Sequence, residues 1–107
     1  MKFIKFILLL TLTFLPSFGA VFAEEKIKIG LLVPLTGKNS EIGQSIIKAV
    51  RLAINQINTS SIEIIPKDTA SSPEISLRSA KELKAMGVKI VIGPVFSESL
   101  IYLNELN

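Results

Sequence analysis

Two hydrophobic patterns alternate along this chain. Three short, nearly continuous apolar runs occupy residues 27–33, 62–65 and 88–92. Such runs are typical of strands that are covered on both faces. Between the runs, apolar residues recur at the three- and four-residue spacing of a helix with one buried side. The pattern therefore predicts β-strands and α-helices in strict alternation.

The predicted helices carry recognisable start signals. Ser40 is a suitable N-cap for the first helix. Ser72 is a suitable N-cap for the second helix, in which Pro73 and Glu74 are favourable residues for the first turn. Ser97 is the expected N-cap of a third helix, inside which the sequence ends. The first helix is expected to bury one apolar stripe, formed by Ile42, Ile46, Ile47, Val50, Ala53, Ile54 and Ile57.

Three strands separated by helices imply right-handed crossovers and a parallel sheet. The expected fold class is α/β, a three-layer βαβαβα arrangement with strand order 2-1-3. Glu63 indicates that the second strand lies at an edge, and Pro66 is expected to stop it. Ligands of such sheets bind at the carboxyl ends of the strands. Any site is therefore expected in the loops 34–39, 67–71 and 93–96.

The N-terminus has the layout of a secretory signal peptide. Lys2 and Lys5 precede an apolar stretch that begins at residue 6, and Pro16 interrupts it. Val21 and Ala23 are the small or short residues that signal peptidase accepts at positions −3 and −1. The sequence therefore predicts a signal peptide over residues 1–23, export by the Sec route to the periplasm, and a domain over residues 24–107.

An uncleaved membrane anchor is the alternative, because the apolar stretch 6–23 could just span a bilayer. Pro16 and the Val-Phe-Ala ending favour cleavage. No Cys follows the stretch, so a lipoprotein is excluded. Removing Lys2 and Lys5 lowers the formal charge from +3 to +1, which removes the case for nucleic-acid binding. The membrane is expected as a partner only through the signal peptide.

The composition excludes several chemistries. The 107 residues include no Cys and no His, so the usual zinc sites, disulfides and Cys or His nucleophile–base pairs cannot be built. Gly37-Lys38 lacks the earlier Gly and the following Ser or Thr of a phosphate-binding loop. No Gly-x-Gly-x-x-Gly follows the first strand. We therefore expect a protein that is not an enzyme and has no cofactor and no metal.

Two residues remain as candidates for binding chemistry. A helix N-terminus offers unpaired N–H groups and partial positive charge, so a small carboxylate can bind there with the Ser97 hydroxyl as an extra donor. The alternative is that Ser97 only caps its own helix, which Glu98 favours because its carboxylate repels an anion. Asp68, at a strand end, faces either a ligand cleft or the backbone of its own turn.

Four segments, taken together, resemble a known family. They are the run from Ile27 to the Pro-Leu-Thr-Gly loop that ends at Gly37, then Ile42-Gly43-Gln44, then Lys67-Asp68-Thr69, and finally Val91-Ile92-Gly93-Pro94-Val95-Phe96-Ser97. In this order and spacing they resemble the N-terminal lobe of the leucine/isoleucine/valine-binding protein family. The similarity covers the whole segment after the predicted signal peptide.

The resemblance implies a type 1 periplasmic binding fold, in which two α/β lobes close on a small ligand such as an amino acid. The ligand is then passed to the permease of an ABC transporter. Ser97 matches the family's carboxylate-binding Ser of Gly-Pro-x-x-Ser, and the Pro-Leu-Thr-Gly loop matches the loop that lines the cleft mouth. The residues expected to bind ligand are Ser97, Thr36, Gly37, Asp68 and Phe96.

A related branch of the family, the penicillin-binding-protein activators, leaves a second function open. That branch uses the same fold as a protein-interaction module in cell-wall synthesis, and the bulky Phe96 before Ser97 is similar to it. The alternative function is therefore an interaction module.

The main departure from the family is length. Family members run to several hundred residues, and a second lobe has no counterpart after Asn107. We therefore expect a truncated or split product that is marginally stable and weak or inactive alone. Its third strand is expected to leave an apolar parallel edge open.

Overall fold

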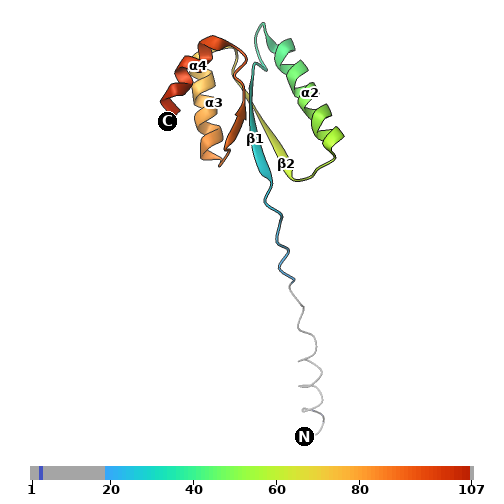
Figure 1. The fold of residues 1–107 in the computed structure, drawn as a ribbon. Coiled ribbons are helices and arrows are strands. Elements are labelled where there is room, and N and C mark those ends of the chain that lie inside the picture. The colour runs from blue at the N-terminus through green and yellow to red at the C-terminus, as the bar shows by residue number, and fades with distance from the viewer. Residues whose placement is uncertain (1–2, 4–18, 107) are drawn as a thin grey trace.

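The computed structural model describes Phe3 and residues 19–106 of the chain. The elements, in order, are β1 (Ile27–Val33), α2 (Ser40–Ile57), β2 (Ile62–Asp68), α3 (Pro73–Ala85), β3 (Ile90–Ile92), α4 (Ser97–Leu103) and the 3-10 helix η1 (Asn104–Leu106) (Figure 1). Most of the predicted signal peptide, residues 1–23, lies outside the described part, which leaves out residues 1–2 and 4–18. Residues 19–26, which lead into β1, carry no helix or strand. None of the described helices has both the length and the apolar character needed to cross a membrane.

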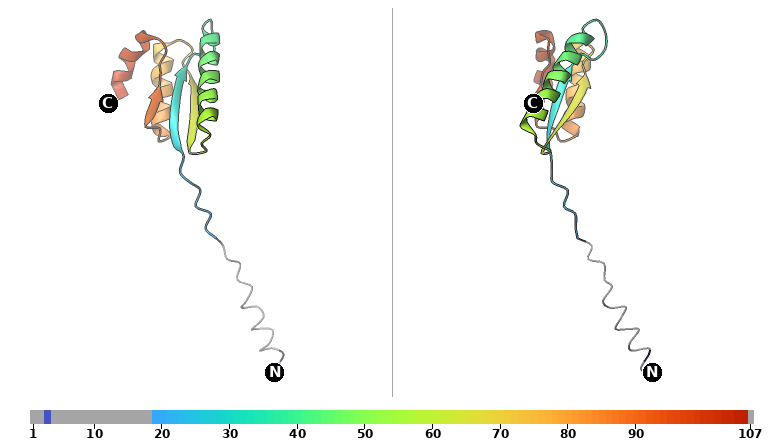
Figure 2. Two further views of the ribbon diagram at one scale, coloured as in Figure 1. Left: turned by 45° about the vertical axis from the view of Figure 1, so that its right-hand side comes forward. Right: turned by 90° about the vertical axis from the view of Figure 1, so that its right-hand side faces the viewer.

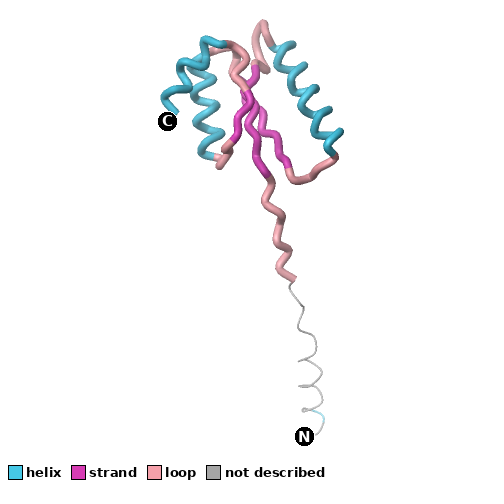
Figure 3. The backbone as a smooth tube through the Cα atoms, in the orientation of Figure 1, coloured by secondary structure: helices cyan, strands magenta, loops and turns pink. Residues whose placement is uncertain are grey.

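The three strands form one parallel sheet in the order β2-β1-β3. In the register of this sheet, Gly30 of β1 lies between Ile65 of β2 and Val91 of β3. Helix α2 lies on one side of the sheet, and α3 and α4 lie on the other (Figures 2 and 3). This arrangement confirms the predicted fold class, the three layers and the strand order.

The core is built around β1, the central strand. Because successive side chains of a strand point to opposite faces, β1 supplies both halves of the core. Leu32 packs with Ala80 and Leu83 on the side of α3, whereas Leu31 and Val33 pack with Ile47 of α2 on the other side. Leu31, Leu32 and Val33 are each at most 1% exposed, as expected for a strand covered on both faces.

Two strand boundaries differ from the sequence prediction. β2 does not stop at Pro66 but continues to Asp68. This is possible because β2 is an edge strand, where the N–H that proline lacks is not needed on the open side. β3 begins at Ile90 rather than Val88, because the backbone N–H of Val88 donates to the carbonyl of Leu83 and so closes the end of α3.

The predicted N-caps are confirmed for one helix and wrong for two. The Ser72 hydroxyl accepts a hydrogen bond from the Ile75 N–H, and Pro73 opens α3 as expected. Ser40 and Ser97, however, are the first residues of their helices, and Asn39 and Phe96 are the N-caps. In both cases the carbonyl of the preceding residue already accepts the first helical hydrogen bonds.

Apolar side chains of both β3 and α2 remain exposed in the described part of the chain. The three residues of β3, which forms the second edge of the sheet, are 40–52% exposed, which confirms the expected open edge. The expected buried stripe of α2 is wrong in part, because Ile42 is 44% and Ile57 62% exposed. The stripe is wider than the area that the sheet can cover.

Candidate functional site

The loops after the three strands gather at one end of the sheet (Figure 1). Val33 at the end of β1 lies opposite Asp68 at the end of β2. The backbone N–H of Thr69 then donates to the carbonyl of Val33 at 3.0 Å, which continues the pairing by one residue. The carboxyl ends of the strands therefore bring the predicted Thr36, Gly37 and Asp68 to the same end.

Asp68 fastens the loop after β1 to the end of β2. Its Oδ1 atom accepts hydrogen bonds from the backbone N–H groups of Leu35 at 2.8 Å, Thr36 at 3.3 Å and Ala70 at 2.8 Å. Its Oδ2 atom accepts a hydrogen bond from the Thr36 hydroxyl at 2.6 Å. The alternative that Asp68 bonds the backbone of its own turn is confirmed by the hydrogen bond from Ala70. The same carboxylate also binds the loop after β1 through Leu35 and Thr36.

The hydrogen bonds of Asp68 also set its ionisation. Burial raises the pKa of the carboxyl group, but the hydrogen bonds from the Thr36 hydroxyl and from the N–H groups of Ala70, Leu35 and Thr36 outweigh this effect. The pKa of Asp68 therefore lies below its ordinary value. At neutral pH the group is an anion whose acceptor positions are largely occupied by protein donors.

A second contact joins the same two loops. The side-chain amide of Asn39 donates to the Ser71 hydroxyl at 3.0 Å. The loops bend sharply here: Gly37 has φ 83°, and Ala70 and Ser71 have φ 47° and 56°. A positive φ, as at Gly37, favours glycine. Ala70 and Ser71 also have a positive φ, and the hydrogen bonds of Asp68 to Ala70 and of Asn39 to Ser71 stabilise this conformation.

Gly43, in the first turn of α2, sets how closely that helix approaches the loop. A Cβ atom at this position would overlap the backbone carbonyl of Pro34. Only glycine allows this contact, so Gly43 is a positioning residue of the site. In the sequence, Gly43 stood out only as part of the family resemblance and was not predicted as a site residue. The feature that could have identified it is a glycine inside an otherwise strong helix pattern.

Ser97 and Phe96 lie at the start of α4, after β3. Phe96 is half-buried and caps the helix through its backbone, whereas Ser97 is exposed. Within residues 19–106, no hydrogen bond involves the Ser97 hydroxyl as a cap. The alternative that Ser97 caps its own helix is therefore wrong, and its hydroxyl remains available at this end of the sheet.

Two contacts that sequence reasoning missed hold the start of α4 in place. Ser99 is 2% exposed, and its hydroxyl lies 3.3 Å from the hydroxyl of the fully buried Ser76 on α3. Gly93 has φ 107°, and a Cβ atom there would overlap the carbonyl of Leu32. The peptide bond between Gly93 and Pro94 is cis. The loop that carries Phe96 and Ser97 is therefore pressed against the end of β1.

The arrangement offers hydroxyl groups and backbone N–H groups rather than catalytic pairs. The Thr36 hydroxyl donates a hydrogen bond to Asp68 and keeps lone pairs as acceptors. The exposed Ser97 hydroxyl makes no capping hydrogen bond among the described residues. Among the described residues, no three acidic side chains lie close enough together to hold a metal ion. Such groups suit reversible binding of a small polar ligand.

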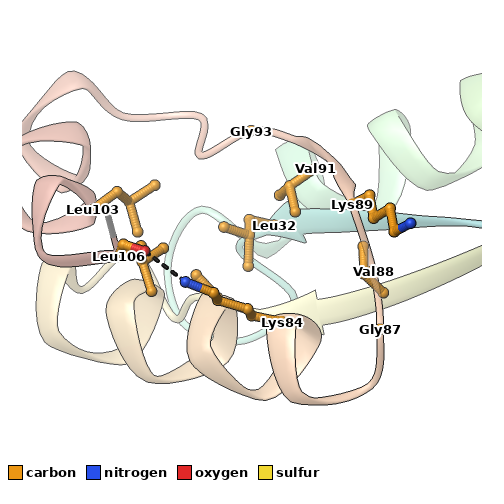
Figure 4. Close-up of a pocket in the computed structure, with 10 residues that line it drawn as sticks. Leu32, Lys84, Gly87, Val88, Lys89, Val91, Gly93, Leu103 and Leu106 are labelled. Atoms are coloured by element: carbon orange, nitrogen blue, oxygen red, sulfur yellow. Dashed lines mark hydrogen bonds between the residues drawn. The ribbon is translucent and has the colours of Figure 1, made fainter.

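A cavity of about 670 Å³ lies elsewhere, between α3, η1 and β3 (Figure 4). Leu32, Val88, Val91, Leu103 and Leu106 contribute apolar lining, and Lys84 closes one side by donating a 2.7 Å hydrogen bond to the Leu106 carbonyl. None of the five predicted ligand-binding residues lines it. The predicted site is therefore the open loop end of the sheet and not this cavity.

The chain is similar to several known proteins. The periplasmic binding protein family matches residues 26–104. The Leu/Ile/Val-binding protein BraC3 of Rhizobium johnstonii is 28% identical over 104 residues, which cover 91% of this chain and 28% of the relative.

Two solved structures share the fold. A solute-binding protein of an ABC transporter from Rhodopseudomonas palustris BisB5, in complex with 3,4-dihydroxybenzoic acid, superimposes with a TM-score of 0.71 and 30% identity. The superposition covers 76% of this chain and 24% of the Rhodopseudomonas protein. The second structure is an ABC transporter substrate-binding protein from Sphaerobacter thermophilus, with a TM-score of 0.71 and 24% identity. The superposition covers 77% of this chain and 24% of that protein, and it supports the fold alone.

This chain therefore spans about a quarter of the length of the relatives that it matches. Within that span the fold superimposes on both solved structures with a TM-score of 0.71. Because the family match extends over most of the chain, this protein belongs to the periplasmic binding protein family.

Proposed function

We propose that this chain is part of the ligand-binding lobe of a periplasmic solute-binding protein that serves an ABC transporter. The observation that carries the proposal is the exposed Ser97 hydroxyl at the start of α4, on the same end of the sheet as Thr36. Family membership and the similarity to the solute-binding protein of an ABC transporter from Rhodopseudomonas palustris BisB5 support it. The role is binding and delivery, not catalysis.

The ligand that fits this end of the sheet is a small carboxylate. The N–H groups at the start of α4 and the Ser97 hydroxyl are donors that suit a carboxylate group. The ligands named for two relatives, branched-chain amino acids and 3,4-dihydroxybenzoic acid, both carry this group. We propose an amino acid as the ligand, with Phe96, Thr36 and Gly37 beside it.

Asp68 has a different role in this proposal. Since its carboxylate already accepts four hydrogen bonds, it has little capacity left for a ligand. We assign it to positioning Thr36 and the loop after β1. The interaction-module alternative is not favoured, because the similar proteins from Rhizobium johnstonii and Rhodopseudomonas palustris BisB5 are solute-binding proteins.

The N-terminus supports export to the periplasm. Val21 and Ala23 precede β1, so a signal peptidase cut after Ala23 removes no residue of the sheet. We propose a Sec signal peptide over residues 1–23 and no lipid anchor. N-terminal sequencing or intact mass of the exported protein checks this, and a retained leader contradicts it.

The ligand test is a nuclear magnetic resonance titration of the exported protein with leucine, valine and 3,4-dihydroxybenzoate up to about 10 mM, a range that detects weak binding. We expect amide shifts confined to the loops 35–37 and 96–98, and their loss in Ser97→Ala. Ser45→Ala, which alters an exposed serine on α2, is the matched control and should shift like the unaltered protein. No shifts at the loop end with any of the three ligands would overturn the assignment.

A further inference from the structure

Helix α4 contacts α3 at both of its ends, through interactions of different kinds. The two helices lie side by side on one face of the sheet (Figure 2). At the far end, Leu103 and Leu106 of the following η1 pack against the buried core around Leu83 of α3. At the start the contact is polar, since the Ser99 hydroxyl lies 3.3 Å from the hydroxyl of Ser76. The position of the first turn of α4 therefore depends on this pair of hydroxyl groups.

The hydrogen bonds of the two serines have a defined direction. Ser76 Oγ lies 2.8 Å from the backbone carbonyl of Ser72, which can only accept, so the single hydroxyl proton of Ser76 is used there. The proton in the 3.3 Å contact is then supplied by Ser99, which donates to a lone pair of Ser76. Both residues are buried, at 0% and 2% exposed, so water does not replace either partner. Ser99 therefore depends on Ser76, whereas Ser76 keeps an acceptor without Ser99.

We propose that Ser76 is a positioning residue for ligand binding, because through Ser99 it holds the first turn of α4 and so fixes where the Ser97 hydroxyl lies. The inference rests on the proposed function, in which Ser97 binds the ligand. Ser97 and Ser99 belong to the same helical turn, so a displacement of one moves the other. Without the Ser76 hydroxyl, the buried Ser99 hydroxyl loses its acceptor, and the start of α4 has to shift to give it another.

Ser79 provides a matched comparison within the same helix. It is also a buried serine of α3, at 5% exposed, but its hydroxyl donates to the backbone carbonyl of Asp68 at 2.9 Å. Ser76 is thus bonded to α4, and Ser79 to the end of β2. Removal of the Ser79 hydroxyl should therefore change the end of β2 and leave the start of α4 in place.

The first test needs no ligand. In nuclear magnetic resonance spectra of the exported protein, Ser76→Ala should shift the amide resonances of residues 96–99, whereas Ser79→Ala should shift those of residues 68–70. Equal shifts of residues 96–99 in the two variants would overturn the proposal. Urea unfolding tests the direction of the hydrogen bonds, because only Ser76→Ala leaves a buried hydroxyl without a partner. Ser76→Ala should therefore unfold at a lower urea concentration than Ser99→Ala, and the reverse order would contradict the assigned donor.

The second test is a titration with leucine, valine and 3,4-dihydroxybenzoate. For a ligand that binds the unaltered protein, the Kd of Ser76→Ala should rise about 3- to 10-fold, the change expected when one hydrogen bond is impaired. The double variant Ser76→Ala/Ser99→Ala has no unpaired hydroxyl at this contact and should return the Kd to within about twofold of the original.

The outcomes of this titration separate the positioning role from the proposed function. A loss of stability alone does not change the Kd of the folded protein, so an unchanged Kd in Ser76→Ala would overturn the positioning role. If the unaltered protein binds none of the three ligands, the proposed function fails, and the amide shifts still decide whether Ser76 positions the start of α4.

Discussion

The Thr36 hydroxyl donates a 2.6 Å hydrogen bond to Asp68 across 32 residues of sequence. Because β1 and β2 run parallel and in register, the loop after one strand meets the end of the other. The same carboxylate also holds the backbone N–H groups of Leu35 and Thr36. The conformation of the loop that carries Thr36 and Gly37 therefore depends on one acidic side chain.

The first prediction concerns this carboxylate. Asp68→Asn keeps the size of the side chain but replaces one acceptor oxygen with a donor NH₂ group, so at least one of the present donors loses its partner. We expect the free energy of unfolding in urea to fall by about 1–3 kcal/mol. Glu63→Gln, an exposed carboxylate on the edge strand β2, is the control and should change it by less than about 0.5 kcal/mol. Equal losses in both variants would show that Asp68 does not hold the loop.

The second prediction is the pH dependence of the same group. The pKa of Asp68 is lowered in the folded state, so its contribution to stability is fully present above the ordinary Asp pKa of about 3.9. That contribution is lost as the pH falls through the lowered folded-state pKa. The stability difference between the unaltered protein and Asp68→Asn should therefore shrink as the pH falls below about 4. A difference that stays constant from neutral to acid pH would contradict the hydrogen-bonded carboxylate.

The third prediction separates the Thr36 hydroxyl from its backbone. Thr36→Val removes the hydroxyl and keeps the shape, so the pKa of Asp68 should rise toward its ordinary value. Thr36→Ser keeps the hydroxyl and should leave that pKa lowered. A carbon-13 titration of the Asp68 carboxyl group measures both variants. The hydroxyl has no part in the ionisation of Asp68 if Thr36→Val titrates like the unaltered protein.

The fourth prediction compares two glycines near the site. Gly43→Ala introduces a Cβ atom that overlaps the Pro34 carbonyl, so α2 must move although alanine is the better helix former. We expect the free energy of unfolding of Gly43→Ala to fall by more than about 2 kcal/mol. Gly37→Ala meets open space and is strained only by its φ of 83°, so about 1–2 kcal/mol is expected. Urea unfolding of the two variants checks the order, and a larger loss for Gly37→Ala would refute the close packing at Gly43.

Much of the fold could be predicted because it follows from local signals. The apolar run predicted β1 with the bounds that the structure has, Ile27–Val33, and Ser72-Pro73 marked the start of α3. Alternating strands and helices then required a parallel sheet. The end of β2 was missed because Pro66 was taken as a stop signal, although the strand was already predicted at an edge, where a proline is tolerated.

The site was predictable as a place but not as a set of contacts. The sequence indicated the loops after the strands, yet it assigned both Thr36 and Asp68 to a ligand. Their mutual hydrogen bond depends on the register of β1 and β2, which no local pattern encodes. Similarly, periodicity shows which side of α2 is apolar but not which part of that side is covered, so Ile42 and Ile57 were predicted to be buried.

The last prediction tests the packing of β1 on α3. A Cβ atom at Gly30 would lie 2.6 Å from Cδ1 of Leu83, which is fully buried. Gly30→Ala alone should therefore overpack the core and cost about 1–3 kcal/mol, and Leu83→Ala alone should leave a cavity and cost about 2–5 kcal/mol. In the double variant the new methyl group occupies part of that cavity, so the loss should be smaller than the sum by about 0.5–3 kcal/mol. Urea unfolding of the four proteins measures this coupling, and strictly additive losses would mean that Gly30 and Leu83 do not pack against each other.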